Sequence, residues 1–157
     1  MTGQKVLYRA KWKYRGAHEC DAAVIACIDF RFWRETAEFV DNYFGAISYD
    51  YPGLPGAAKA INESSGEDLA FSCVGVPCDL HQVKKIILVN HEDCGAYGGS
   101  GKFDGDKEAE QEFHEDELRK AWGLIKDKYP EKDIHLVYAR IGGEGNELEF
   151  LEVDLGE

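Results

Sequence analysis

The stretch Ala22-Ala23-Val24-Ile25-Ala26-Cys27-Ile28 decides the fold, because it is a continuous apolar run without a charged side chain. A strand with one face in water alternates apolar and polar residues, whereas a parallel strand covered by helices on both faces is apolar throughout. The run Ile86-Ile87-Leu88-Val89 has the same character further along the chain. The sequence therefore predicts two buried, parallel strands at the centre of a sheet.

Helical and further strand patterns alternate with these two runs. After the first run, Trp33, Ala37, Val40 and Phe44 recur at helical spacing, and Gly45 follows as a stop. We also expect a short strand within residues 46–51 that ends at the turn formers Pro52-Gly53 and Pro55-Gly56, followed by pieces of helix between 57 and 83. A long helix after residue 105 has an acidic first half that we expect to be solvated, and strands are expected over 134–141 and 148–153. This order predicts an α/β fold, with a central, mostly parallel sheet flanked by helices and a C-terminal hairpin.

The first fifteen residues differ in charge from the rest of the chain. They carry five basic side chains and no acidic one, although the whole chain has a net charge of −12. Apolar residues alternate with mostly basic ones from Val6 to Tyr14, which predicts an extended arm with one apolar face. The arm fits an edge strand of its own domain or a partner subunit equally well. We divide the chain into an N-terminal arm, 1–20, and one domain, 21–157.

Composition excludes several classes of function. The net charge of −12 repels phosphate backbones and anionic lipids, so we expect no nucleic-acid or membrane partner. No apolar run reaches the roughly 20 residues that a membrane span needs, and no secretory signal is recognisable. We therefore expect a cytoplasmic protein, in which the cysteines are ligands, nucleophiles or buried thiols rather than disulfides.

Chemically active side chains follow the two buried strands, at the point where each strand ends. Cys27 ends the first strand, and His91 and Cys94 follow the second. Neighbouring parallel strands that send their next helices to opposite faces open a crevice at their carboxyl ends, where ligands bind. Two thiolates and one imidazole form a known three-ligand set for Zn²⁺, and three protein ligands leave the fourth tetrahedral position open. The sequence therefore predicts a zinc site made by Cys27, His91 and Cys94.

Other motifs and reactive side chains are set aside. Residues 96–103 follow a strand but lack the first glycine and the final Ser or Thr of a phosphate-binding loop. His18 and Cys20 precede the first strand by its whole length, so we do not expect them in the zinc site. We expect core positions for Cys73 and Cys78. His81, His114 and His135 show no partner pattern, so we expect them to be solvated or hydrogen-bonded.

Two short motifs resemble those of the β-class carbonic anhydrases. That family has a C-x-D-x-R segment at the end of one strand and an H-x-x-C segment at the end of another. Here these are Cys27-Ile28-Asp29-Phe30-Arg31 and His91-Glu92-Asp93-Cys94, and Gly95-Ala96 follows as in the family. In element order the resemblance extends from about residue 22 to residue 153, and it implies a β-carbonic-anhydrase-like fold.

The resemblance implies a function and roles for these residues. Cys27, His91 and Cys94 would bind Zn²⁺, and Asp29 with Arg31 would form a dyad beside the zinc-bound hydroxide that hydrates carbon dioxide reversibly to bicarbonate and a proton. Asp29 would either pair with Arg31 or fill the fourth zinc position. The family also implies a homodimer at least. Two alternatives stay open: a hydrolase for carbonyl sulfide or carbon disulfide on the same site, and a non-catalytic module that zinc stabilises.

Overall fold

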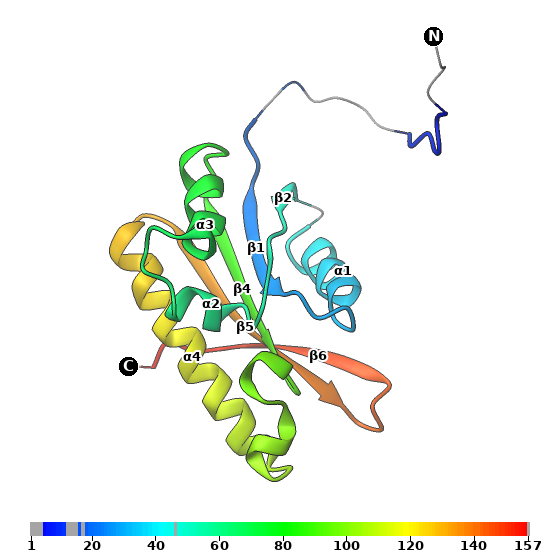
Figure 1. Ribbon diagram of the computed structural model, residues 1–157, viewed down its shortest axis with the longest axis vertical. Coiled ribbons are helices and arrows are strands. Elements are labelled where there is room, and N and C mark those ends of the chain that lie inside the picture. The colour runs from blue at the N-terminus through cyan, green and yellow to red at the C-terminus, as the bar shows by residue number, and fades with distance from the viewer. Residues whose placement is uncertain (1–4, 12–15, 17, 46, 157) are drawn as a thin grey trace.

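The computed structural model of this 157-residue chain describes residues 5–11, 16, 18–45 and 47–156. A sheet crosses the body, and helices lie on both of its faces (Figure 1). None of the helices in these ranges combines the length and the apolar character that crossing a membrane requires. The α/β class with a C-terminal hairpin, predicted from the sequence, is confirmed.

The sheet has the strand order β2-β1-β4-β5-β6, with β3 also paired to β1. Its strands are β1 (Ala22–Cys27), β2 (Tyr49–Asp50), β3 (Gly53–Leu54), β4 (Lys85–His91), β5 (Asp133–Gly142) and β6 (Glu147–Glu152). The pairs β1–β2, β1–β3, β1–β4 and β4–β5 are parallel, and only β5–β6 is antiparallel. The two apolar runs are therefore adjacent central strands, as predicted.

Alternation along β1 explains why both faces of the sheet are covered. Ala23 and Ile25 pack beneath α2 (Ala58–Asn62), α3 (Leu69–Asp79) and α4 (Lys107–Lys128). Ala22 and Val24 face the opposite side, where Val40 of α1 (Trp33–Tyr43) covers them. Successive side chains of a strand point to opposite faces, so a strand between two helical layers must be apolar at every position.

Helices α3 and α4 each begin at an aspartate whose side chain caps the first turn. The carboxylate of Asp68 accepts a hydrogen bond from the backbone N–H of Phe71 at the start of α3, and that of Asp106 accepts one from Ala109 at the start of α4. These bonds satisfy backbone donors that have no partner within the helix. Two short 3₁₀ turns, Gly95–Tyr97 and Ser100–Phe103, connect the end of β4 to α4.

Several local expectations were wrong. Trp33 is 46% exposed, because the buried face of α1 runs through Thr36 and Val40 instead. Gly53, expected in a turn, begins strand β3. Glu110, expected in a solvated acidic half of α4, is buried with the nearby His114, because this part of the helix packs behind the end of β4.

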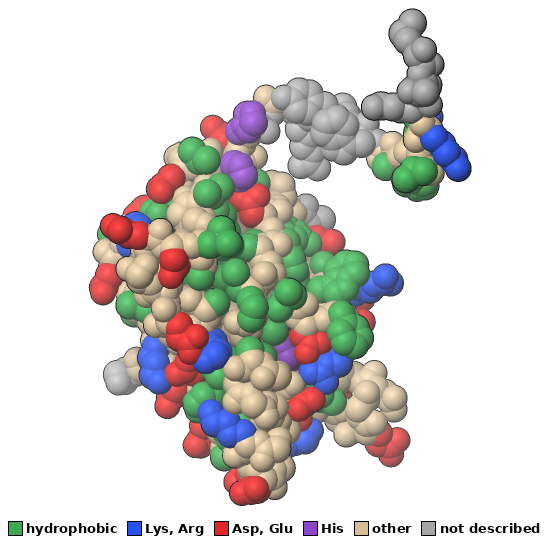
Figure 2. Space-filling model, viewed as in Figure 1, with side chains coloured by type: hydrophobic (Ala, Val, Ile, Leu, Met, Phe, Trp, Pro, Cys, Tyr) green, Lys and Arg blue, Asp and Glu red, His purple; other side chains and the backbone are tan. Residues whose placement is uncertain are grey.

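The N-terminal arm is described only in part. Residues 5–11 carry no helix or strand, and all are exposed. Their basic and hydrophobic side chains stand away from the body, whose surface carries many acidic side chains (Figure 2). The predicted alternation continues through Trp12 and Tyr14, which lie outside the described residues.

Replacing Leu118 by alanine tests the packing of α4 against the sheet. Leu118 is fully buried in the larger core cluster, so Leu118→Ala should lower the free energy of unfolding by about 2–5 kcal/mol. Leu124→Ala on the same helix is the control, because this side chain is 43% exposed and its truncation should cost less than about 1 kcal/mol. Urea unfolding measures both; equal losses would contradict the packing described.

Candidate metal centre

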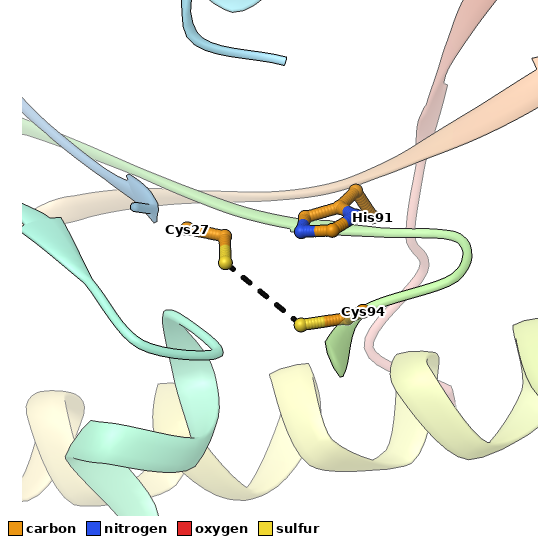
Figure 3. A group of neighbouring side chains, drawn as sticks. All are labelled: Cys27, His91 and Cys94. Carbon is orange, nitrogen blue, oxygen red and sulfur yellow. Dashed lines mark hydrogen bonds between the residues drawn. The ribbon is translucent and has the colours of Figure 1, made fainter. Parts of the chain in front are cut away.

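Cys27, His91 and Cys94 converge at the carboxyl ends of β1 and β4 (Figure 3). Cys27 is the last residue of β1, His91 is the last of β4, and Cys94 follows after a short turn. All three are buried, and their ligand atoms lie within 4.8 Å of one another. The structure thus brings together the three residues that the sequence singled out as metal ligands.

The spacing of the two sulfur atoms suits a tetrahedral metal. Cys27 Sγ and Cys94 Sγ are 3.8 Å apart. Two sulfurs bound to one Zn²⁺ at about 2.3 Å in tetrahedral geometry are also about 3.8 Å apart. The two cysteines need no rearrangement to share such an ion.

His91 is oriented as a ligand by its surroundings. Its Nδ1 lies 2.7 Å from the carbonyl oxygen of Glu92, so this nitrogen carries the proton and donates it. The other ring nitrogen, Nε2, is buried and has no hydrogen-bond partner. A buried polar atom without a partner is costly, and a hydrogen bond at one ring nitrogen commonly sets the other for metal binding. Phe32 stacks on the ring with centroids 4.0 Å apart, which fixes its plane.

A hydrogen bond joins the two cysteine sulfurs. It lowers the pKa of the Cys27 thiol below its ordinary value despite burial. The same bond, together with burial, raises the pKa of Cys94. A divalent cation bound between the sulfurs would replace the proton of this bond and favour the thiolate form of both cysteines.

Asp29 and Arg31 form a close ion pair beside these ligands. Arg31 Nη2 donates to Asp29 Oδ2 at 2.7 Å, and Arg31 Nε donates to Oδ1 at 3.0 Å. These bonds hold the pKa of the Asp29 carboxyl below its usual range. Asp29 Oδ2 also lies 4.0 Å from His91 Nε2, so the carboxylate borders the point where the three ligands meet. In this structure Asp29 is paired with Arg31.

Asp93 is a partner of the pair that the sequence reasoning missed. Arg31 donates from Nη1 to Asp93 Oδ2 at 2.9 Å and from Nη2 to the Asp93 carbonyl oxygen at 3.0 Å. The guanidinium therefore joins the end of β1 to the turn between His91 and Cys94. The signal was present, because Asp93 lies inside the second motif, but a motif does not tell which way a side chain on a turn points.

Two buried glutamates hold the turn that carries Cys94. Glu110 of α4 accepts a hydrogen bond from the backbone N–H of Asp93 at 2.7 Å. Glu92 accepts one from the backbone N–H of Ile141 in β5 at 2.9 Å and pairs with Lys107 of α4. Each buried carboxylate thus has a donor, and the turn is bound to elements on both of its sides.

Three aromatic residues lie in or beside the two motifs, and they differ in burial and contacts. Tyr97 is buried and belongs to the cluster that contains Cys27 and Cys94. Phe32 is buried and stacks on His91. Phe30 is 82% exposed.

A comparison with protein families assigns the chain. A family model described as "Putative carbonic anhydrase" matches residues 17–146, which include both motifs. The chain belongs to this carbonic anhydrase family. The expected family resemblance is therefore confirmed.

Relatives of this carbonic anhydrase family member include two uncharacterized rickettsial proteins. One, from Rickettsia bellii, is 31% identical over 132 residues, which cover 80% of each chain. The other, from Rickettsia conorii, is 29% identical over 133 residues, covering 80% of this chain and 70% of the relative. Both are described as uncharacterized, so the similarity assigns no activity.

Solved structures share the fold of this carbonic anhydrase family member at low identity. The β-carbonic anhydrase isoform I of Trichomonas vaginalis aligns with a TM-score of 0.58 at 16% identity, covering 92% of this chain and 87% of that one. A β-carbonic anhydrase of Aspergillus fumigatus gives 0.60 at 13% identity, with coverages of 90% and 78%. The carbonic anhydrase of Glaciozyma antarctica gives 0.55 at 15% identity, with coverages of 85% and 81%.

Removing one sulfur tests the metal centre. Cys27→Ser should lower the zinc content of the purified protein by one equivalent per chain, because two of three ligands bind a cation much more weakly. Cys73→Ser is the matched control, since Cys73 is a half-buried thiol that does not belong to the group of Cys27, His91 and Cys94. Elemental analysis measures both; unchanged zinc in Cys27→Ser would contradict the assignment.

Proposed function

We propose that this protein catalyses the reversible hydration of carbon dioxide to bicarbonate and a proton, with Zn²⁺ held by Cys27, His91 and Cys94. The single observation that carries the proposal is the grouping of these three buried donors beside the Asp29–Arg31 pair. Membership of a carbonic anhydrase family and the fold shared with β-carbonic anhydrases support it.

The donor set suits the cation and the reaction. When bound by three protein ligands, Zn²⁺ lowers the pKa of a coordinated water, which makes hydroxide available near neutral pH. The carbonyl oxygen of Glu92 keeps the His91 ring in the tautomer whose Nε2 faces the sulfurs. Phe32 covers one face of that ring and keeps water away from it.

Asp29 is the residue that would accept the proton. Arg31 binds both of its oxygens, which fixes the carboxylate in one orientation and keeps it ionised. Its side chain is still 16% exposed, so the proton has a route onward to solvent. In the hydration direction, the oxygen of water bonds to the carbon of carbon dioxide, and the proton released passes to Asp29 and then to buffer.

Arg31 acts as a positioning residue through two carboxylates. Its contacts with Asp93 fix the guanidinium on the turn of the second motif, and its contacts with Asp29 then place the base. A lysine at this position has one donor centre and cannot form both sets of bonds. The dyad thus depends on the planar, forked shape of the guanidinium.

Replacing the base tests catalysis separately from metal binding. Asp29→Asn should keep the zinc content and the fold but reduce kcat/KM for carbon dioxide hydration by about 10²–10⁴-fold, because the amide cannot accept the proton. Asp127→Asn, at an exposed position of α4, is the matched control and should keep full activity. Stopped-flow hydration with a pH indicator measures both variants.

The same experiment separates the rival functions. Zinc-loaded Asp29→Asn with unchanged hydration would favour a non-catalytic zinc module. Negligible hydration by the wild-type protein, together with rapid sulfide release from carbonyl sulfide, would favour the sulfur-analogue hydrolase and overturn the proposal.

Hydration should become faster as the pH rises above neutral. Two thiolates return negative charge to the cation, so a coordinated water is less acidic than in a site with three imidazoles. Arg31 holds the pKa of Asp29 below its usual range, so Asp29 is already ionised at neutral pH and does not cause the rise. A plot of kcat/KM against pH checks this; a rate that falls from pH 7 upward would contradict it.

A further inference from the structure

A second group of metal-binding side chains lies at the opposite end of the sheet. Cys20 precedes β1, Asp50 ends β2, and His81 follows α3. Their ligand atoms lie within 4.8 Å of one another, and in the described residues this is the only such group besides Cys27, His91 and Cys94. Seven residue-to-residue steps lead from Cys20 to Cys27, which is about 23 Å of extended chain at about 3.3 Å per step. The two groups are therefore independent.

We propose that Cys20, Asp50 and His81 form a second binding site, for a divalent transition-metal ion of the Zn²⁺ type. The sequence reasoning gave His81 no partner and considered Cys20 only for the first site, because the three residues are far apart in the sequence and share no motif. The site goes beyond the proposed hydration activity and does not depend on it.

The backbone holds the three donors together before any ion binds. The N–H of Cys20 donates to the carbonyl oxygen of His81 at 3.0 Å, so the segments before β1 and after α3 are joined directly. Parallel pairing of β1 with β2 sets Asp50 opposite Ala23, which fixes the third donor. A site assembled on fixed backbone loses little conformational entropy when it closes on a cation.

The distances are close to those of a zinc site. Cys20 Sγ and Asp50 Oδ2 are 3.7 Å apart. Sulfur and oxygen ligands of one tetrahedral Zn²⁺ are about 3.5 Å apart. His81 Nδ1 donates to Asp50 Oδ2 at 2.6 Å, and an entering cation would replace this hydrogen bond, with the two atoms separating by less than about 1 Å. All three side chains are half-buried, which leaves room for water as the fourth ligand.

The donor types select the class of cation. One thiolate, one imidazole and one carboxylate suit Zn²⁺ and similar transition metals, whereas Mg²⁺ and Ca²⁺ need a shell of oxygen ligands. A nucleophilic cysteine is a poorer interpretation, because burial and the Asp50 carboxylate raise the pKa of the Cys20 thiol. On metal binding the S–H bond of Cys20 breaks, the sulfur binds the cation, and the proton passes to buffer. The Nδ1 proton of His81 also passes to solvent while Nε2 takes one up, so the ring stays neutral and Nδ1 is free to bind the cation.

Metal stoichiometry of the full-length chain tests the site. We would dialyse the wild-type protein to equilibrium against excess Zn²⁺ and measure zinc per chain by elemental analysis. Two equivalents are expected for the wild type and for the control Cys73→Ser, and one equivalent each for Cys20→Ser and His81→Gln. Equal zinc content in the wild type and in Cys20→Ser, whether one or two equivalents, would overturn the proposal.

Cobalt identifies the ligands and separates this proposal from the first. In Cys27→Ser, which lacks a sulfur of the first site, Co²⁺ should still produce a thiolate-to-cobalt absorption band, and the double variant Cys20→Ser/Cys27→Ser should show a weaker band. An unchanged band in the double variant would assign the sulfur to Cys94 and contradict a role for Cys20. Carbon dioxide hydration by Cys20→Ser should equal that of the wild type, which also shows that this variant folds.

Discussion

The parallel pairing of β1 with β4 is the constraint on which the rest of the structure depends. Its register places Ala26 opposite Val89, so both strands end at the same edge of the sheet. Cys27 and His91 are thereby neighbours although 64 positions separate their numbers. Only apolar side chains fit a pair of strands covered on both faces, and polar residues therefore collect where the strands end. The chemistry at this edge is a consequence of the way the core is built.

Behind the metal centre the protein buries polar groups that the reaction does not use. Asn90 accepts a hydrogen bond from the backbone N–H of Ala58 and lies 3.2 Å from His114 Nδ1. Burial lowers the pKa of His114 to about 4, so its ring is neutral at physiological pH. Together with Glu110, these residues connect β4, α2 and α4 by specific bonds. A polar network of this kind fixes one arrangement of the elements where apolar packing alone would allow several.

The sequence predicted what depends on local pattern and on strand order. Continuous apolar runs identified the central strands. The rule that ligands bind at the carboxyl ends of neighbouring parallel strands then predicted that Cys27, His91 and Cys94 lie together. It did not predict contacts made by side chains on turns, such as Arg31 with Asp93, because these depend on backbone angles that no periodicity reports. It also misjudged Glu110, since hydrophobic spacing assigns polar residues to the surface by default. Cys20, Asp50 and His81 were missed because they meet only through the fold.

Arg31 binds two carboxylates, those of Asp29 and Asp93. The two members of the Asp29–Arg31 pair therefore differ in how firmly each is held. The guanidinium also binds a side-chain and a backbone oxygen of Asp93, on a turn whose backbone N–H is bound by Glu110. The Asp29 carboxylate is bound by the guanidinium and the backbone N–H of Arg31. If the guanidinium and Asp29 separate, the bonds to Asp93 still hold the guanidinium, so Asp29 is the side chain expected to move. The ion pair can therefore open and re-form by movement of Asp29 alone, while Arg31 stays bound to Asp93.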